Sequence, residues 1–99
     1  MSQSKKLTEL YEELHDLARQ MGVTVRYEKG DFEGGYCILK ENKILLVNRR
    51  LQAQKKASIL AVGLQEIGLE NMFVKPAVRH FIEDEAAKAS AARQSQEAR

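Results

Sequence analysis

The sequence predicts a small α+β domain, ordered helix, strand, strand, strand, helix, helix, with a mostly antiparallel three-stranded sheet packed by helices. Three observations predict it. Apolar residues recur every three or four positions near the start, two short apolar runs flank a polar turn, and a helical pattern follows the second run directly. Because 99 residues give room for one core, we expect a single domain over residues 1–85 and an Ala-rich tail over residues 86–99.

The first helix is indicated by one apolar face opposite an acidic one. Its apolar positions are Leu7, Leu10, Tyr11, Leu14, Leu17, Ala18 and Met21. Gly22 stands where helices commonly end in a left-handed residue. Val23, Val25 and Tyr27 then alternate with polar residues, which is typical of a half-buried strand.

The apolar runs 36–39 and 44–47 indicate a β-hairpin with Asn42 in the left-handed position of its turn. Neither run alternates strictly, so we expect both strands to be central and covered in part on both faces. Cys37 is then expected to be a small buried hydrophobic residue. As the single cysteine it makes no internal disulfide, which fits a reducing compartment.

A second helix is predicted over residues 51–67, and Gly68 is suited to end it. Its inward stripe is Ala57, Leu60, Ala61, Leu64 and Ile67. We expect Phe73 in the core and a third helix from about Pro76, with Ala77, Val78, Phe81 and Ile82 facing inward. From residue 86 the sequence has good helix formers but no large apolar side chain, which predicts a frayed helix or disorder.

Composition places the chain among ordinary globular proteins, with 43% hydrophobic and 30% charged residues. No stretch resembles a membrane span, and the charged opening is unlike a secretory signal, so we expect a cytoplasmic protein. The net charge of +2 is unevenly spread. Between Tyr36 and Gln65, six Lys or Arg stand against one acidic residue.

The junction between the last strand and the second helix carries the candidate contact residues. Arg49, Arg50, Lys55 and Lys56 form a basic group that could meet phosphates or a protein partner. Lys40 and Lys43 lie at the other end of the strand, so the two groups need not form one patch. Aromatic residues that would stack on bases are missing from this segment apart from Tyr36.

The residues ILLVN, followed by RRLQAQKKASILAVGLQEIGLE, resemble the front half of the ImmA/IrrE-type zincin-like metallopeptidases. In that family a strand ending in Asn leads into a helix with HExxH, whose histidines bind zinc and whose Glu acts as general base. Two registers are open here. One places the motif on residues 62–66 and keeps no functional residue, and the other places it on residues 65–69 and keeps Glu66 alone. The resemblance therefore implies a zincin-like scaffold without metal or hydrolytic activity.

No catalytic, metal-binding or cofactor-binding constellation stands out, so we lean towards a protein that is not an enzyme and uses no cofactor. A domain this small buries a modest share of its surface, which favours a partner that adds interface. Our leading expectation is a protein-interaction or self-associating module, with a protein partner or a homo-oligomer and no membrane. The alternative is a nucleic-acid-binding accessory protein that uses the basic junction.

Overall fold

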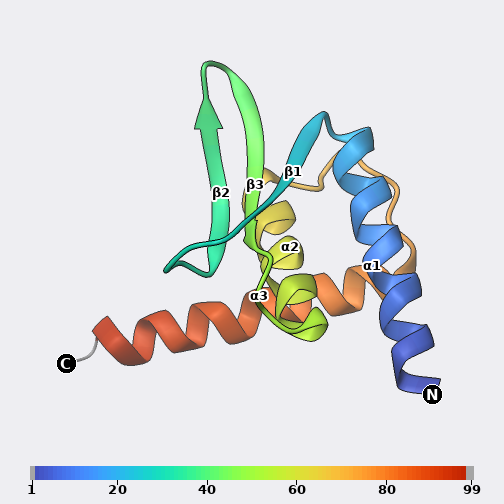
Figure 1. Cartoon of the computed structure of the whole chain (residues 1–99). Coiled ribbons are helices and arrows are strands. Elements are labelled where there is room, and N and C mark those ends of the chain that lie inside the picture. The colour runs from blue at the N-terminus through green and yellow to red at the C-terminus, as the bar shows by residue number, and fades with distance from the viewer. Residues whose placement is uncertain (1, 98–99) are drawn as a thin grey trace.

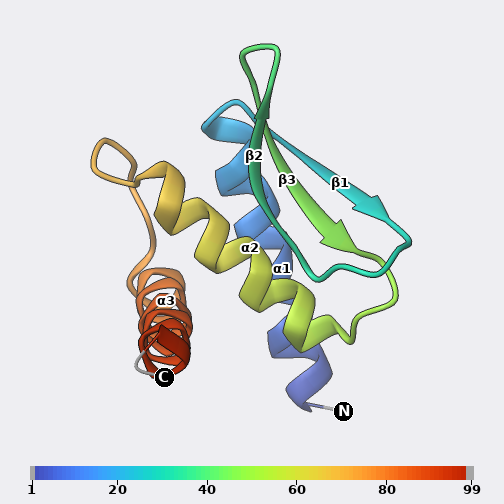
Figure 2. The ribbon, with the colours of Figure 1, turned by 90° about the vertical axis from the view of Figure 1, so that its left-hand side faces the viewer.

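The computed structural model describes the backbone of residues 2–97 and the side chains of residues 5–93, and it confirms a small α+β domain in the expected element order. The elements are α1 (Ser2–Gln20), β1 (Val23–Glu28), β2 (Gly34–Leu39), β3 (Asn42–Asn48), α2 (Ala53–Ile67) and α3 (Pro76–Glu97). The three strands form one sheet, with the helices gathered on one side of it (Figures 1 and 2).

The expectation of a mostly antiparallel sheet is wrong, because the sheet is mixed. Its strand order is β1-β3-β2, with β1 parallel to β3 and β2 antiparallel to β3. The loop 29–33 carries the chain from the end of β1 around the end of β3 to the far edge, where β2 begins. The last strand in sequence is thus the central one, and both β1 and β2 are edge strands.

The hairpin turn also differs from the expectation, since Asn42 is not in its left-handed position. Leu39 pairs with Asn42, and the two residues between them, Lys40 and Glu41, have φ values of 49° and 71°. Positive φ at both central residues is what a type I′ turn, one of the two favoured two-residue hairpin loops, requires. This register points Leu45 into the core, and a shift by one residue would turn it outward.

The core lies between the sheet and the helices. Leu45 and Val47 of β3 face α2, and Gly63 of α2 approaches so closely that an added Cβ would stand 2.0 Å from Leu45 Cδ2. Ile44, on the opposite face of β3, is 8% exposed yet lies outside the core cluster. The described chain places no helix over that opposite face, which is on the right in Figure 2. The expectation of a central strand covered in part on both faces thus agrees with β3, but it is wrong for β2, which is an edge strand with Cys37, Ile38 and Leu39 exposed.

The three helices follow the expected apolar stripes with one exception, Ala77, and a second expected core residue, Phe73 of the connector, is also exposed. Leu14, Leu17 and Ala18 of α1 are buried, and so are Ala57, Leu60, Ala61 and Leu64 of α2 and Val78 and Ile82 of α3. Ala77, in the first turn of α3, is exposed. Phe73, in the connector before α3, is 84% exposed instead of being in the core.

Helix α3 continues to Glu97, so the predicted tail is helical as far as the structure describes it. Residues 98–99 of that tail lie outside the described residues. The C-terminal half of α3 runs past the edge strand β2 (Figure 1). Among the described residues, no helix is both long enough and apolar enough to cross a membrane.

Candidate interaction surfaces

The basic junction is held in place by one buried polar residue, Asn48, which ends β3 and is 7% exposed. Its amide Nδ2 donates to the carbonyl oxygens of Gly30 at 2.8 Å and Phe32 at 2.6 Å, and its Oδ1 accepts from the Arg50 N–H at 3.0 Å. The first two bonds hold the crossover loop against the end of β3. The third caps the turn that directs the chain into α2.

The structure divides the four candidate basic residues into two kinds. Lys55 forms an ion pair with Glu33 at 3.6 Å, and Lys56 Nζ lies 5.8 Å from the centre of the Tyr27 ring, within cation-π range. Arg49 and Arg50 are exposed, and no ion pair is found for either within the described side chains. The sequence-predicted group of four is thus reduced to two cations whose charge is open to a ligand.

The other two cations of this segment do not join the basic junction. Lys40 and Lys43 are exposed at the tip of the β2–β3 hairpin, while Arg49 and Arg50 follow the opposite end of β3. Figure 1 shows the hairpin tip projecting away from the helices. A single extended basic patch is therefore not formed.

The two registers of the zincin motif fall on the second half of α2 and on the residues that follow it. Glu66 is exposed near the end of α2, and Gly63 lies buried against β3. In the part of the chain that the structure describes, no group of three His, Cys, Asp or Glu side chains could hold a metal ion. His15 and His80 lie on different helices, and His80 is exposed.

A hydrogen-bonded aromatic cluster, which sequence reasoning missed, joins α1 to β1. The Tyr11 hydroxyl donates to the Tyr27 hydroxyl, which lies 2.5 Å from His15 Nε2. The His15 and Tyr27 rings are stacked at 5.8 Å, and Lys56 covers Tyr27. The sequence pattern indicates which face of its strand or helix each of these residues occupies. It does not show that the three side chains meet, because that depends on how α1 packs on β1.

Burial sets the proton states of this cluster. Burial lowers the pKa of His15, and the charge of Arg19 lowers it further against the opposing effect of Asp16. Burial also raises the pKa of Tyr11 and, with the Tyr11 hydrogen bond, the pKa of Tyr27. The lowered pKa favours the neutral imidazole, whose Nε2 shares a hydrogen bond with the Tyr27 hydroxyl, and that hydroxyl also accepts from Tyr11. The Tyr11 hydroxyl, the Tyr27 hydroxyl and His15 Nε2 are thus hydrogen-bonded to one another in a chain that joins α1 to β1.

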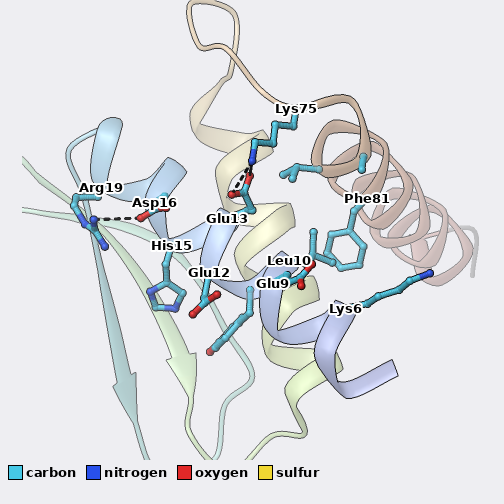
Figure 3. Close-up of a pocket in the computed structure, with 13 residues that line it drawn as sticks. Lys6, Glu9, Leu10, Glu12, Glu13, His15, Asp16, Arg19, Lys75 and Phe81 are labelled. Atoms are coloured by element: carbon cyan, nitrogen blue, oxygen red, sulfur yellow. Dashed lines mark hydrogen bonds and ion pairs between the residues drawn. The ribbon is translucent and has the colours of Figure 1, made fainter. Parts of the chain in front are cut away.

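An open depression of about 1200 Å³ lies between α1 and the start of α3 (Figure 3). Leu10, Val78 and Phe81 supply apolar surface, and charged residues of both signs surround them. Lys75, the residue just before α3, reaches across to Glu13 of α1 at 3.2 Å. The mixed charge favours no particular ligand, and His15 at the rim already has its ring bound to Tyr27.

The most distinctive surface is the β2 edge, defined here as residues Gly34–Leu39. Ile38 is 63% exposed and Leu39 is 55% exposed. Cys37 is also exposed, which corrects the expectation of a buried hydrophobic residue. The cause is topological: β3 occupies the centre of the sheet, so β2 has a neighbour on one side only and its Cys37 face carries no helix.

The register settles which backbone groups of the β2 edge are free. Asn48 N–H donates to the Glu33 carbonyl oxygen at 3.0 Å, so the odd-numbered residues of this segment exchange bonds with β3. Hydrogen bonding alternates along an antiparallel ladder. The N–H and C=O groups of Tyr36 and Ile38 consequently point away from β3, towards the open side of the sheet.

Comparison with known proteins gives no further guide: no family model, no curated protein and no solved structure matches this chain.

Proposed function

We propose that this protein is a non-enzymatic protein-interaction module that adds its β2 edge to a strand of a partner. The observation that carries the proposal is the β2 edge itself, a six-residue edge strand with neither charge nor proline and with outward backbone groups at Tyr36 and Ile38. Proteins commonly protect such edges with charges, prolines or bulges. The other edge, β1, carries the Arg26–Glu28 ion pair at 3.0 Å. The unprotected edge suits strand addition, a recurrent mode of peptide recognition.

The non-enzymatic part of the proposal is supported by the aromatic cluster. Catalytic acids and bases have free access to a substrate and a pKa near the working pH. Here His15, Tyr11 and Tyr27 bond to one another, and the raised pKa of Tyr27 keeps its hydroxyl protonated. We propose that the resemblance to zincin-like metallopeptidases concerns the scaffold alone. An exposed thiol at Cys37 is kept reduced most readily in the cytoplasm, so the proposal includes that location.

The experiment uses the full chain as bait in chemical cross-linking, with wild type, Ile38→Pro and Ile38→Thr in parallel. Proline removes an N–H that points away from β3, so the edge is blocked while the hairpin ladder is kept. Threonine keeps that N–H and the β-branched shape. Cross-links from residues 34–39 to a partner that are lost with proline and kept with threonine are the expected result. Equal cross-linking by the proline variant would refute docking by the β2 edge.

A second candidate is nucleic-acid binding by the basic junction, and the exposed side chains of Arg49 and Arg50 favour it. Cations at this position would bind phosphates and give an affinity that falls steeply with salt. The proposal is weaker than strand addition because Lys55 and Lys56 already contact Glu33 and Tyr27. Its test is the salt-dependent binding measurement given below.

A further inference from the structure

We infer that the strand that pairs with the β2 edge is β2 of a second copy of this chain, antiparallel and centred on Cys37, so that one continuous sheet spans both copies. The inference rests on the proposed function, because it names the occupant of the same edge. Three features support it, namely the register, the surface area and the course of α3, and Cys37 provides a way to test the register.

The register is self-complementary. In an antiparallel pair, residues with outward backbone groups must face each other. Centring on Cys37 places Tyr36 opposite Ile38 of the second copy, and Ile38 opposite its Tyr36, so both pairs exchange N–H···O=C bonds. Leu39 then lies opposite Gly35 of the second copy, where a glycine leaves room for a large side chain. The paired segment 35–39 contains no charge that would oppose its own copy.

The area that the chain leaves exposed is large enough for such an interface. The accessible surface is 7170 Å². For a compact monomer of 11.2 kDa, size scaling gives about 5,700 Å², which leaves about 1,500 Å² in excess. A standard protein interface buries about 800 Å² on each partner. The hairpin tip and the C-terminal part of α3 both project from the rest of the chain (Figure 1).

The course of α3 fits a second copy on this side. Its C-terminal half extends beyond β2 on the helix side of the sheet, as both ribbon views show (Figures 1 and 2). In a symmetric antiparallel pair, the hairpin of the second copy points in the opposite direction, so it would pack against this overhanging part of α3. The overhang is rich in alanine from Ala86 to Ala92, and small side chains allow a sheet to approach a helix closely. Ile38 of the second copy, exposed in the single chain, would be covered there.

Cys37 supplies a direct reporter of the register. Its backbone groups point towards β3, so in the symmetric pair Cys37 faces its own copy as a non-hydrogen-bonded pair. Such pairs bring Cα atoms to about 4.5 Å, within the range of about 4.4–6.8 Å that a disulfide needs. Residue 39 of one copy would instead lie about 13 Å along the strand from residue 39 of the other, at about 3.3 Å per residue.

The first test is diamide oxidation of the purified chain, followed by non-reducing electrophoresis. Diamide takes two electrons and two protons from two thiols, so Cys37 of each copy is joined as a disulfide and diamide becomes its hydrazine. Wild type is expected to give a disulfide dimer. The matched control is Cys37→Ser/Leu39→Cys, which moves the thiol two residues along the same exposed face and is expected to give at least about tenfold less dimer. Equal dimer in both would show random collision and overturn the inferred register.

The second test is sedimentation equilibrium of the reduced protein at several concentrations and at high salt. Wild type and Ile38→Thr are expected to associate to twice the 11.2 kDa chain mass, and Ile38→Pro at least about tenfold more weakly. Should Ile38→Pro lose its circular dichroism spectrum, Ile38→Lys replaces it as a charged edge. A wild-type chain that stays monomeric overturns the second-copy inference. Edge-dependent cross-links to another protein would then still support the proposed function, whereas their absence as well would overturn both.

Discussion

Replacing Asn48 should reveal how much one buried amide contributes to this fold. In Asn48→Ala, the chain loses the bonds to the Gly30 and Phe32 carbonyls and to the Arg50 N–H. At about 1 kcal/mol for each hydrogen bond, the expected loss of unfolding free energy is about 3 kcal/mol. For a domain of this size, this corresponds to a fall of about 15 °C in Tm.

Asn48→Asp separates the donor role from the shape of the side chain. The carboxylate keeps an acceptor for the Arg50 N–H but turns an oxygen towards two carbonyl oxygens. At pH 7, Asn48→Asp should therefore lose more free energy of unfolding than Asn48→Ala does. These oxygens would raise the carboxyl pKa in the folded state above the unfolded value of about 3.9. A raised folded pKa means that stability returns as the pH falls towards 4. Asparagine at neutral pH and protonated aspartic acid near pH 4 both supply a donor.

Urea unfolding followed by circular dichroism, from pH 4 to pH 7, measures these differences at constant m-value. Each variant is compared with wild type at the same pH, because carboxylates elsewhere in the fold also titrate. The matched control is Asn42→Ala, which removes an exposed asparagine from the other end of the same strand and should change the free energy of unfolding by less than about 0.5 kcal/mol. A loss below about 1 kcal/mol in Asn48→Ala, or an Asn48→Asp variant as stable as wild type, would refute the reasoning.

Three further outcomes are expected. Gly63→Ala should lose about 1–3 kcal/mol of unfolding free energy in urea titrations, because its Cβ would meet Leu45, and an unchanged midpoint would contradict the close helix–sheet approach. Burial lowers the pKa of His15 in the folded state below its ordinary value of 6.5. The contribution of neutral His15 to the free energy of unfolding is therefore complete above pH 6.5 and is lost as the pH falls below that value. In His15→Asn, the free energy of unfolding should change less between pH 7 and 5.5 than in wild type. If the basic junction binds nucleic acid, fluorescence anisotropy of short DNA and RNA at about 50, 100 and 200 mM salt should show an affinity that falls steeply with salt. The variant Arg49→Glu/Arg50→Glu should not bind. No binding by wild type at about 50 mM salt would exclude that function.

The helices could be predicted from the sequence because their apolar periodicity is a local property. Leu14 and Leu17 of α1, and Leu60 and Leu64 of α2, are buried as their spacing indicated. Gly68 ends α2, with its N–H bonded to the Leu64 carbonyl oxygen. These features depend on residues within a few turns of one another, so the linear pattern contains the information.

The sheet topology could not be predicted in the same way. The alternation of Val23, Val25 and Tyr27 is the same whether β1 pairs parallel or antiparallel. The amide of Asn48 selects the crossover by bonding two carbonyls some 16 and 18 residues earlier in the chain, and no local pattern announces such a bond. The exposure of Cys37 follows from that topology, so it was missed for the same reason.

The candidate site was predicted in part. The positions of Arg49 and Arg50 at a strand-to-helix junction were correct, but charge counting could not show that Lys55 meets Glu33 or that Lys56 lies over Tyr27. The free edge of β2 became visible once the strand order was known. The stretch Tyr36–Leu39 contains the relevant apolar residues, yet the same residues would suit a central strand.

The central position of β3 constrains the order in which the chain can fold. The strand that β1 pairs with is separated from it by the whole of β2, whereas β2 and β3 are joined by a two-residue turn. Closing the short loop costs less chain entropy, so the hairpin is expected to form before β1 joins it. During synthesis from the N-terminus, α1 and β1 emerge before their sheet partner exists. A nascent chain that ends before β3 therefore has no sheet to join, and its apolar faces stay open to other chains.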